Sequence, residues 1–183
     1  MKKSLTKETK IPEGVEVKVH GDMIIVKGRE GELKRKFDLG KIKAEVKDNK
    51  IILKDETASK KEKKIMNTVS AHLKNMIIGV KEKYEYKLKV CSSHFPIGVD
   101  VQGRNVSIKN FLGEKIPRKT KLPEGVEAKV NKEFIIITSC DKELAGQAAA
   151  KFEEVTKIKD RDRRIFQDGI FMITKAGREI WNS

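Results

Sequence analysis

The chain has 183 residues, of which 37% are charged and 38% hydrophobic, and its 41 Lys and Arg residues exceed its 27 Asp and Glu residues, for a net charge of +14. A surplus of this size is best balanced by a polyanion, so nucleic acid is the first expected partner and an anionic membrane surface the second. The composition excludes a membrane span, because no apolar stretch approaches ~20 residues, and two cysteines exclude a disulfide framework, so a soluble cytoplasmic protein is expected.

The N-terminal residues 1–10 are expected to form a mobile basic arm, and a pattern that occurs twice begins directly after them. Residues 11–28 align without a gap with residues 122–139, 111 positions later, and nine of the 18 aligned residues are identical. Each copy predicts a turn at Pro-Glu-Gly, a strand of alternating apolar and charged residues, a tight turn and a second, apolar strand. Such a repeat predicts a duplicated structural unit.

The rest of the first unit combines strands with one helix. Two strands joined by a turn are predicted between residues 42 and 53. Ser59 followed by Glu62 forms a capping-box pattern that predicts a helix start, and the apolar stripe of this helix ends at Gly79. We therefore expect residues 11–80 to form a small antiparallel sheet covered by one helix.

A second unit is predicted over residues 81–175. Alternating residues between 84 and 108 predict further strands, the second copy of the repeat follows, and Asp141 is a good N-cap for a helix. Asp168-Gly169 lies between apolar runs and predicts a β-hairpin, so this pair is interpreted as turn geometry. The expected fold class is α+β, with two tandem copies of a small antiparallel β-sheet and one helix packed on each; residues 176–183 form a C-terminal tail.

Five short motifs add a family likeness to this pattern. They are NMIIGV, YEYKLKV, HFPI, NFLGEKIPR and RIFQDGIF, at residues 75–80, 84–90, 94–97, 110–118 and 164–171. In this order, and with the duplication, they resemble the archaeal and eukaryotic branch of the L-six family of large-subunit ribosomal proteins, over about residues 8–176. The resemblance implies a two-domain protein that binds large-subunit ribosomal RNA in cytoplasmic ribosomes. It also implies a place among neighbouring ribosomal proteins near the stalk base where translation factors dock, without catalysis and without a cofactor.

Residues 102–121 are the first candidate RNA-binding segment, with six basic side chains and one acidic one. A glycine turn lets backbone N–H groups approach a phosphate while basic side chains flank it, and a phenylalanine beside such a turn can stack on a base. The resemblance places this segment on the domain that makes most RNA contacts. The alternative is a solvated basic loop. The candidate residues are Arg104, Lys109, Phe111, Gly113, Lys115, Arg118, Lys119 and Lys121.

The second candidate segment follows the second helix. A helix dipole favours cations after its C-terminus, so part of this run can act as a cap. Three arginines within four positions exceed that need, and the arginine fork fits a phosphate with two hydrogen bonds. The candidate residues are Lys157, Lys159, Arg161, Arg163 and Arg164.

Signals for an enzyme are weak. The three histidines lie far apart without zinc-ligand spacing, and no phosphate-binding loop, nucleophile elbow or dinucleotide motif occurs. Cys91, which precedes Ser92, Ser93 and His94, is interpreted as a small packed residue at the end of a strand. No catalytic residue, metal or small-molecule substrate is therefore expected. The main alternative is a basic protein-interaction or assembly module that recognises acidic neighbours or docks peptides at its sheet edges.

Overall fold

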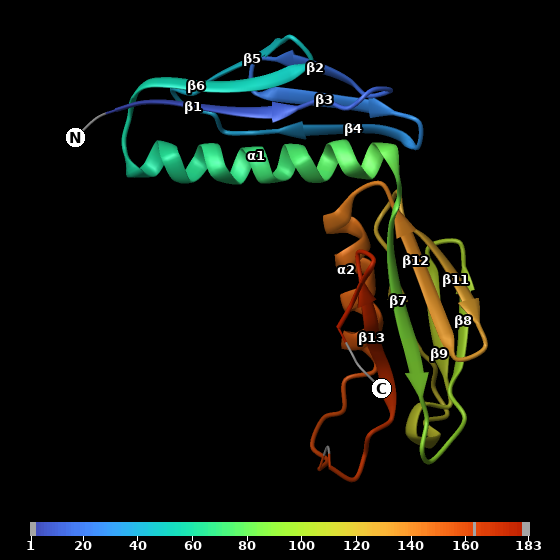
Figure 1. Cartoon of the computed structure of the whole chain (residues 1–183). Coiled ribbons are helices and arrows are strands. Elements are labelled where there is room, and N and C mark those ends of the chain that lie inside the picture. Colours follow the sequence, from blue (N-terminus) through green and yellow to red (C-terminus); the bar gives the residue numbers. More distant parts are fainter. Residues whose placement is uncertain (1–2, 163, 181–183) are drawn as a thin grey trace. The chain divides into compact units, whose positions relative to one another are not determined.

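The chain folds into two compact units, Met1–Lys83 and Tyr84–Ser183 (Figure 1). The computed structural model describes residues 3–162 and 164–180. In both units antiparallel strands pack against a helix, which confirms the α+β fold of two tandem sheet-and-helix copies. The boundary falls three residues later than the sequence predicts, because the first helix continues to Lys81 before the next strand starts at Tyr84.

The described part of the first unit has two three-stranded sheets that share one helix. One sheet has the order β1-β6-β5 and the other the order β2-β3-β4, and α1 contacts strands of both (Figure 1). Ile24, Val26, Ile51, Leu53 and Leu73 form the centre of this core, each at most 1% exposed. The elements are β1 Lys3–Lys10, β2 Glu16–His20, β3 Met23–Gly28, β4 Gly31–Lys36, β5 Lys43–Lys47, β6 Lys50–Ala58 and α1 Lys60–Lys81.

Helix α1 begins where the capping pattern predicts. The Ser59 hydroxyl accepts a hydrogen bond from the Lys61 N–H at 3.2 Å, and the Glu62 carboxylate accepts one from the Ser59 N–H at 2.9 Å. The predicted end at Gly79 is wrong, because the helix continues to Lys81. Tertiary contacts hold this last turn in place: Val80 is fully buried, and its carbonyl oxygen accepts the Glu30 N–H at 2.9 Å.

The close approach of β3 to the end of α1 depends on Gly28. A Cβ atom at this position would lie 2.7 Å from the Val80 carbonyl oxygen and 2.8 Å from its Cγ2. We expect Gly28→Ala to lower the free energy of unfolding by about 1–3 kcal/mol, because the helix end must move away. Urea denaturation followed by circular dichroism measures this loss. Gly98→Ala is the matched control, since its Cβ would meet only Lys109 Cβ at an ordinary 3.7 Å; equal losses in the two variants would contradict the packing argument.

The prediction of a mobile arm over residues 1–10 is wrong for the described part of that segment. Lys3–Lys10 forms β1, which pairs with β6 along its length. The side chain of Thr9 is buried and its hydroxyl lies 3.2 Å from that of Ser70 on α1, while Glu8 pairs with Lys50 at 2.8 Å. One face of this strand therefore covers the helix although the segment is strongly charged.

The second unit contains a three-stranded and a five-stranded sheet within its described residues. Their orders are β10-β9-β8 and β11-β12-β7-β13-β14, and α2 packs on β7, β12 and β13 (Figure 1). Tyr86, Leu88, Ile135, Ile137 and Phe152 are buried at the centre. The elements are β7 Tyr84–Cys91, β8 Gly98–Gln102, β9 Asn105–Lys109, the 3-10 turn η1 Phe111–Gly113, β10 Arg118–Lys121, β11 Glu127–Asn131, β12 Phe134–Ser139, α2 Lys142–Val155, β13 Gly169–Lys175 and β14 Arg178–Glu179.

The repeat in the sequence is also a repeat in the structure. Strands β2 and β3 have the same lengths as β11 and β12, with bounds 111 positions apart, and Glu16 faces Lys27 as Glu127 faces Thr138. The likeness extends upstream of the aligned segments. The Ile11 N–H donates to the carbonyl oxygen of Asn49, and the Leu122 N–H donates to that of Arg104, both at 2.8 Å. In this scheme β1 corresponds to β10.

Two predictions near the C-terminus need correction. Asp168-Gly169 is not a hairpin turn, because the described residues between α2 and Asp168 form no strand and β13 pairs with β7 instead. The Asp168 side chain is buried and accepts a hydrogen bond from the backbone N–H of Ser93, so it holds the loop that follows β7. The tail is not wholly separate either: β14 pairs with the end of β13, while residues 181–183 lie outside the described part.

Candidate nucleic-acid interface

Three loops meet at one end of the second unit, and we call them the loop cluster. Loop A is residues 92–97 between β7 and β8, loop B is residues 110–117 between β9 and β10, and loop C is residues 157–168 between α2 and β13. Figure 1 shows all three at the same end of this unit. The two segments that the sequence singles out are therefore brought together by the fold, although about 40 residues of chain separate them.

Arg118, the first residue of β10, links loop B to loop C. Its guanidinium donates to the two carboxylate oxygens of Glu114 at 2.8 and 2.6 Å, and to the carbonyl oxygens of Val155 and Lys157 at 2.9 and 3.4 Å. The guanidinium carbon lies 4.3 Å from the centroid of the Phe111 ring. Hydrogen bonding by Arg118 outweighs the effect of burial and holds the pKa of Glu114 below its usual 4.5. This arginine works as a clamp between the two candidate segments.

Asp168, the last residue of loop C, anchors loop A. One carboxylate oxygen accepts the backbone N–H groups of Ser93 at 2.5 Å and His94 at 3.1 Å, and the other lies 2.5 Å from His94 Nδ1. Burial alone would raise the pKa of Asp168, but these contacts outweigh it and hold the pKa below its usual 3.8. The His94 ring also stacks on Phe166 with 5.1 Å between centroids. Loop A is thus fixed at two points of loop C.

The structure contradicts the role predicted for Phe111 and changes the one predicted for Gly113. Phe111 is only 1% exposed, so its ring belongs to the core and cannot stack on a base in this conformation. The Gly113 N–H donates to the Asn110 carbonyl at 3.4 Å and the Glu114 N–H to the Phe111 carbonyl at 3.0 Å, so both groups are used inside the turn. Gly113 is required for another reason: its φ of +78° lies in the left-handed region.

Two of the candidates lie at the opposite end of the β10-β9-β8 sheet from the loop cluster. Arg104, in the turn between β8 and β9, pairs with Glu124 and donates from Nε to the Leu122 carbonyl at 3.1 Å. Lys121 faces Asn105 at this same end, while Lys109 and Arg118 lie at the end next to loop B. The predicted cations therefore do not form one continuous site, because Arg104 and Lys121 lie away from the loop cluster.

The candidate arginines and lysines differ in their partners. Arg104, Arg118 and Arg164 each pair with a carboxylate of this chain, the last with Asp162 at 2.8 Å. Arg161 is exposed and lies over Phe166, 4.9 Å from the ring centroid, and Arg163 lies outside the described residues. In residues 3–162 and 164–180, five exposed candidate lysines have no ion pair with a carboxylate: Lys115, Lys119, Lys121, Lys157 and Lys159. The uncompensated charge of the candidates is therefore mostly carried by lysine.

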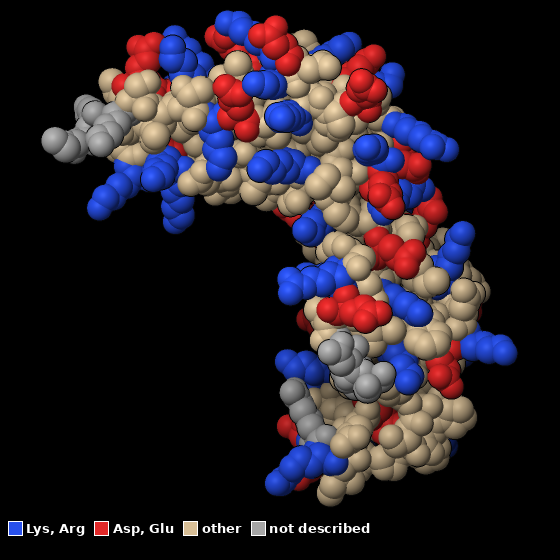
Figure 2. Space-filling model, viewed as in Figure 1, with Lys and Arg blue, Asp and Glu red and all other residues tan. Residues whose placement is uncertain are grey.

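Charge is not confined to the loop cluster. Figure 2 shows Lys and Arg side chains over both units on the face in view, with Asp and Glu side chains among them. Several cations of the first unit, such as Lys34 beside Glu32 and Lys47 beside Glu45, pair with acidic neighbours on their own strand. The charge of the whole chain thus does not single out one surface, and the loop cluster differs from the paired regions in its unpaired lysines.

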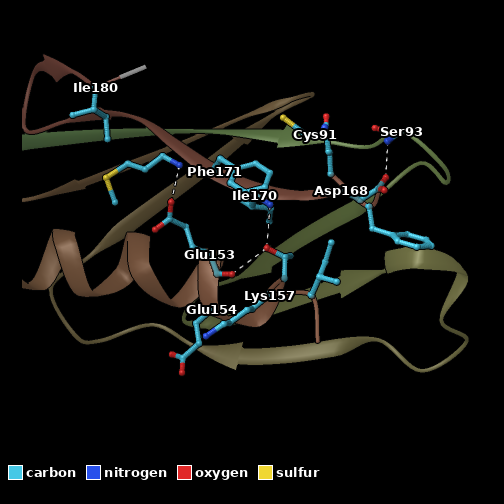
Figure 3. A pocket seen from close by; sticks show the side chains of 14 residues that line it. Cys91, Ser93, Glu153, Glu154, Lys157, Asp168, Ile170, Phe171 and Ile180 are labelled. Atoms are coloured by element: carbon cyan, nitrogen blue, oxygen red, sulfur yellow. Dashed lines mark hydrogen bonds between the residues drawn. The ribbon is translucent and has the colours of Figure 1, made fainter. Parts of the chain in front are cut away.

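A groove of about 990 Å³ lies between α2 and β13, next to loop C (Figure 3). Its polar side chains already bind the part of β13 that β14 does not pair with: Glu153 accepts the Met172 N–H at 2.9 Å, and Thr156 accepts the Ile170 N–H at 3.0 Å. Burial raises the pKa of the Cys91 thiol above 9.0, which disfavours a reactive thiolate. These groups cover the open edge of a β-strand, and they do not converge on a reacting centre.

The sequence reading missed Asp168 and His94, which hold the loops together. Asp168-Gly169 looks like a turn, and only the burial of the aspartate and its distant partners reveal another role. The available signal was the family likeness, because the HFPI motif contains His94 and the RIFQDGIF motif contains Asp168. In the described part of the chain, no helix is long and apolar enough to cross a membrane and no group of His, Cys, Asp and Glu is arranged to hold a metal ion.

Comparison with known proteins identifies the family. The model of the family described as ribosomal protein L6 matches residues 11–83 and 95–169, one match in each unit. The chain belongs to the ribosomal protein L6 family. It is 42% identical over 176 residues to the large ribosomal subunit protein uL6 of Methanococcus vannielii, covering 96% of this chain and 97% of that protein. It is also 42% identical over 176 residues to uL6 of Methanosarcina mazei, covering 96% and 100% of the two chains.

Membership in the L6 family confirms the resemblance that the five motifs indicate. The two matched segments correspond to the two units, so the family includes the duplication. The second match contains loop B, loop C and the second half of loop A, so most of the loop cluster lies within the matched segment.

Proposed function

We propose that this chain is a structural component of the large ribosomal subunit and that it binds ribosomal RNA through the loop cluster of its second unit. Family membership supports the ribosomal role, because both relatives are named large ribosomal subunit proteins. The observation that carries the RNA-binding site is the group of exposed, unpaired lysines on loops B and C, Lys115, Lys157 and Lys159, which the rest of the unit holds in place. The resemblance further suggests a position near the stalk base, among other large-subunit proteins.

Arginines and lysines have different roles in this site, because the arginines are paired within the chain and the lysines are not. Arg118 donates its hydrogen bonds to Glu114 and to two backbone carbonyls. We therefore assign it the role of positioning loops B and C. Lysines act as point charges and adapt to a phosphate without a fixed geometry. Double-stranded RNA hides its major-groove edges, so contacts to phosphates and 2′-hydroxyls should matter more than base identity. No step of this function requires a cofactor or a reacting group.

Sedimentation tests the ribosomal role. In a sucrose gradient at low magnesium, where subunits separate, the chain should migrate with large subunits, and nuclease treatment should release it. Migration as free protein would overturn the proposal. Continued association with proteins after nuclease treatment would instead favour a protein-interaction module, which recognises acidic neighbours rather than RNA.

Salt dependence tests the site itself. We expect the double variant Lys115→Gln, Lys159→Gln to bind large-subunit rRNA more weakly, because two unpaired cations at the loop cluster are removed. The slope of log K against log salt should flatten by up to about one for each lost phosphate contact. Filter binding at four or more salt concentrations measures both quantities.

The matched control is Lys43→Gln on β5, which removes an exposed lysine from the first unit. This variant should keep the wild-type slope. A larger change for Lys43 than for the loop-cluster lysines would move the RNA contact to the first unit.

A further inference from the structure

Loop A exposes an aromatic ring that the core does not need. The side chain of Phe95 is 49% exposed, although the unit around it buries Phe111 and Phe152 almost completely. Exposure of a large apolar side chain on a loop has no stabilising effect of its own, and such side chains are typical of binding surfaces. Two further apolar side chains of the loop cluster are exposed, Ile116 on loop B at 82% and Ile165 on loop C at 64%.

The backbone on both sides of Phe95 is fixed. On one side Asp168 holds the N–H groups of Ser93 and His94, and on the other the Asn110 side chain donates to the Pro96 carbonyl at 3.0 Å. A ring between two such anchors is presented to a partner with little conformational freedom left to lose on binding.

Gly113 supports one side of the ring. A Cβ atom at this glycine would lie 3.4 Å from Phe95 Cε2, so the ring rests directly against the backbone of loop B. The ring is therefore part supported and part open to solvent, which is the arrangement of a stacking surface.

The charges near the ring favour a polyanion. Three of the four acidic side chains of loops B and C are occupied, Glu114 by Arg118, Asp162 by Arg164 and Asp168 by His94, and the fourth is the exposed Asp160. Lys115, Lys157 and Lys159 on the same loops have no carboxylate partner within the described residues. An exposed aromatic side chain in the same loop cluster as unpaired cations fits a nucleic acid, in which a base can stack while its phosphates meet the lysines.

We propose that Phe95 is the stacking platform of the loop cluster and receives an unpaired base of the bound RNA. This inference rests on the proposed function and assigns to Phe95 the role that the sequence alone suggested for Phe111. Unpaired bases are the part of an RNA that aromatic side chains recognise, because bases inside a duplex are already stacked.

Substitution of Phe95 in the full chain, with transcribed large-subunit rRNA as the probe, tests the proposal. Phe95→Ala should weaken binding by about five- to 160-fold, which is the usual effect of losing one base–aromatic stack. The salt slope should stay at the wild-type value, because no charge is removed. Phe95→Tyr should retain most of the affinity and Phe95→Leu should not, since only the former keeps an aromatic face.

Phe171→Ala on β13 is the control, because it removes a phenylalanine that is 40% exposed outside the loop cluster. It should change the affinity by less than twofold while its circular dichroism spectrum stays native. Photo-cross-linking from p-benzoylphenylalanine at position 95 should map to unpaired nucleotides.

The outcomes distinguish a failure of the stacking role from a failure of the proposed RNA-binding site. Wild-type affinity of Phe95→Ala, together with weakened binding of the Lys115→Gln, Lys159→Gln variant, would overturn the stacking role and leave the RNA site standing. Equal binding by Leu and Tyr variants would show a merely apolar contact, and cross-links to protein instead of RNA within the subunit would assign the ring to a protein neighbour. Wild-type binding by all of these variants would overturn the proposed site as well.

Discussion

Replacing Asp168 by alanine should lower the free energy of unfolding by about 1.5–3 kcal/mol, the range for losing hydrogen bonds to a charged group. The variant removes the acceptor of the Ser93 and His94 N–H groups and the partner of the His94 ring. Both residues belong to loop A. Urea denaturation of the full chain measures the loss. Hydrogen exchange adds a local readout, because the amides of Ser93 and His94 should lose their protection before those of β7.

Asp168→Asn is the informative companion variant. The amide keeps an oxygen for the two backbone donors but loses the negative charge, so its cost should be smaller than that of alanine. If both variants unfolded like the wild type and kept the two amides protected, Asp168 would not be the anchor of loop A.

The same carboxylate makes stability depend on pH in a defined direction. Its pKa in the folded chain lies below the ordinary 3.8, so the ionised form is stabilised by folding. That stabilisation is present above the unfolded pKa of about 3.9 and is lost as the pH falls through the folded pKa. The difference in unfolding free energy between wild type and Asp168→Asn should therefore shrink as the pH falls below about 4. A difference that grew in acid would contradict the contact with His94.

The second large effect is expected at Arg118. Arg118→Ala removes hydrogen bonds to Glu114, to the Val155 carbonyl and to the Lys157 carbonyl, and should cost about 1–3 kcal/mol of stability. Arg118→Lys should recover little, because an ammonium group cannot form the two parallel bonds to Glu114. Binding of rRNA should weaken in both variants, since loops B and C are no longer clamped together.

Salt dependence distinguishes positioning from contact. The sequence alone suggests that Arg118 meets a phosphate directly, which predicts a slope flatter by about one in Arg118→Ala. The pairing with Glu114 favours a positioning role, so we expect a lower affinity with less than half the slope change of Lys115→Gln. A full loss of one in the slope would restore the direct contact and contradict the clamp.

Much of the fold was predictable because its signals are local. The capping box at Ser59 and Glu62 fixed the start of α1, and the repeat fixed β2, β3, β11 and β12. The end of α1 was not, because Gly79 is a helix-ending residue by itself and only the buried Val80 and its bond to Glu30 carry the helix onward. Strand β1 was not predicted for a similar reason. Its partner β6 is 40 residues away, and six of the eight residues of β1 are Lys, Thr or Glu.

The sequence predicts the two basic segments of the candidate site, but not which residues the fold brings together there. Charge pattern found loops B and C, because lysines and arginines are visible in any sequence. It did not reveal that Arg104 and Arg118 meet carboxylates of the same chain, or that Phe111 is covered, since both facts depend on which strands are neighbours. Loop A escaped notice because its role depends on a contact between His94 and Asp168 across 74 positions.

The equivalent backbone bonds at the two hairpin turns show how the copies could diverge after gene duplication. Asn49 in one copy and Arg104 in the other offer the same carbonyl oxygen to the first residue of the repeat, so the bond is indifferent to the side chain that carries it. A duplicated protein can in this way keep an old framework in both halves while one half acquires a new surface chemistry.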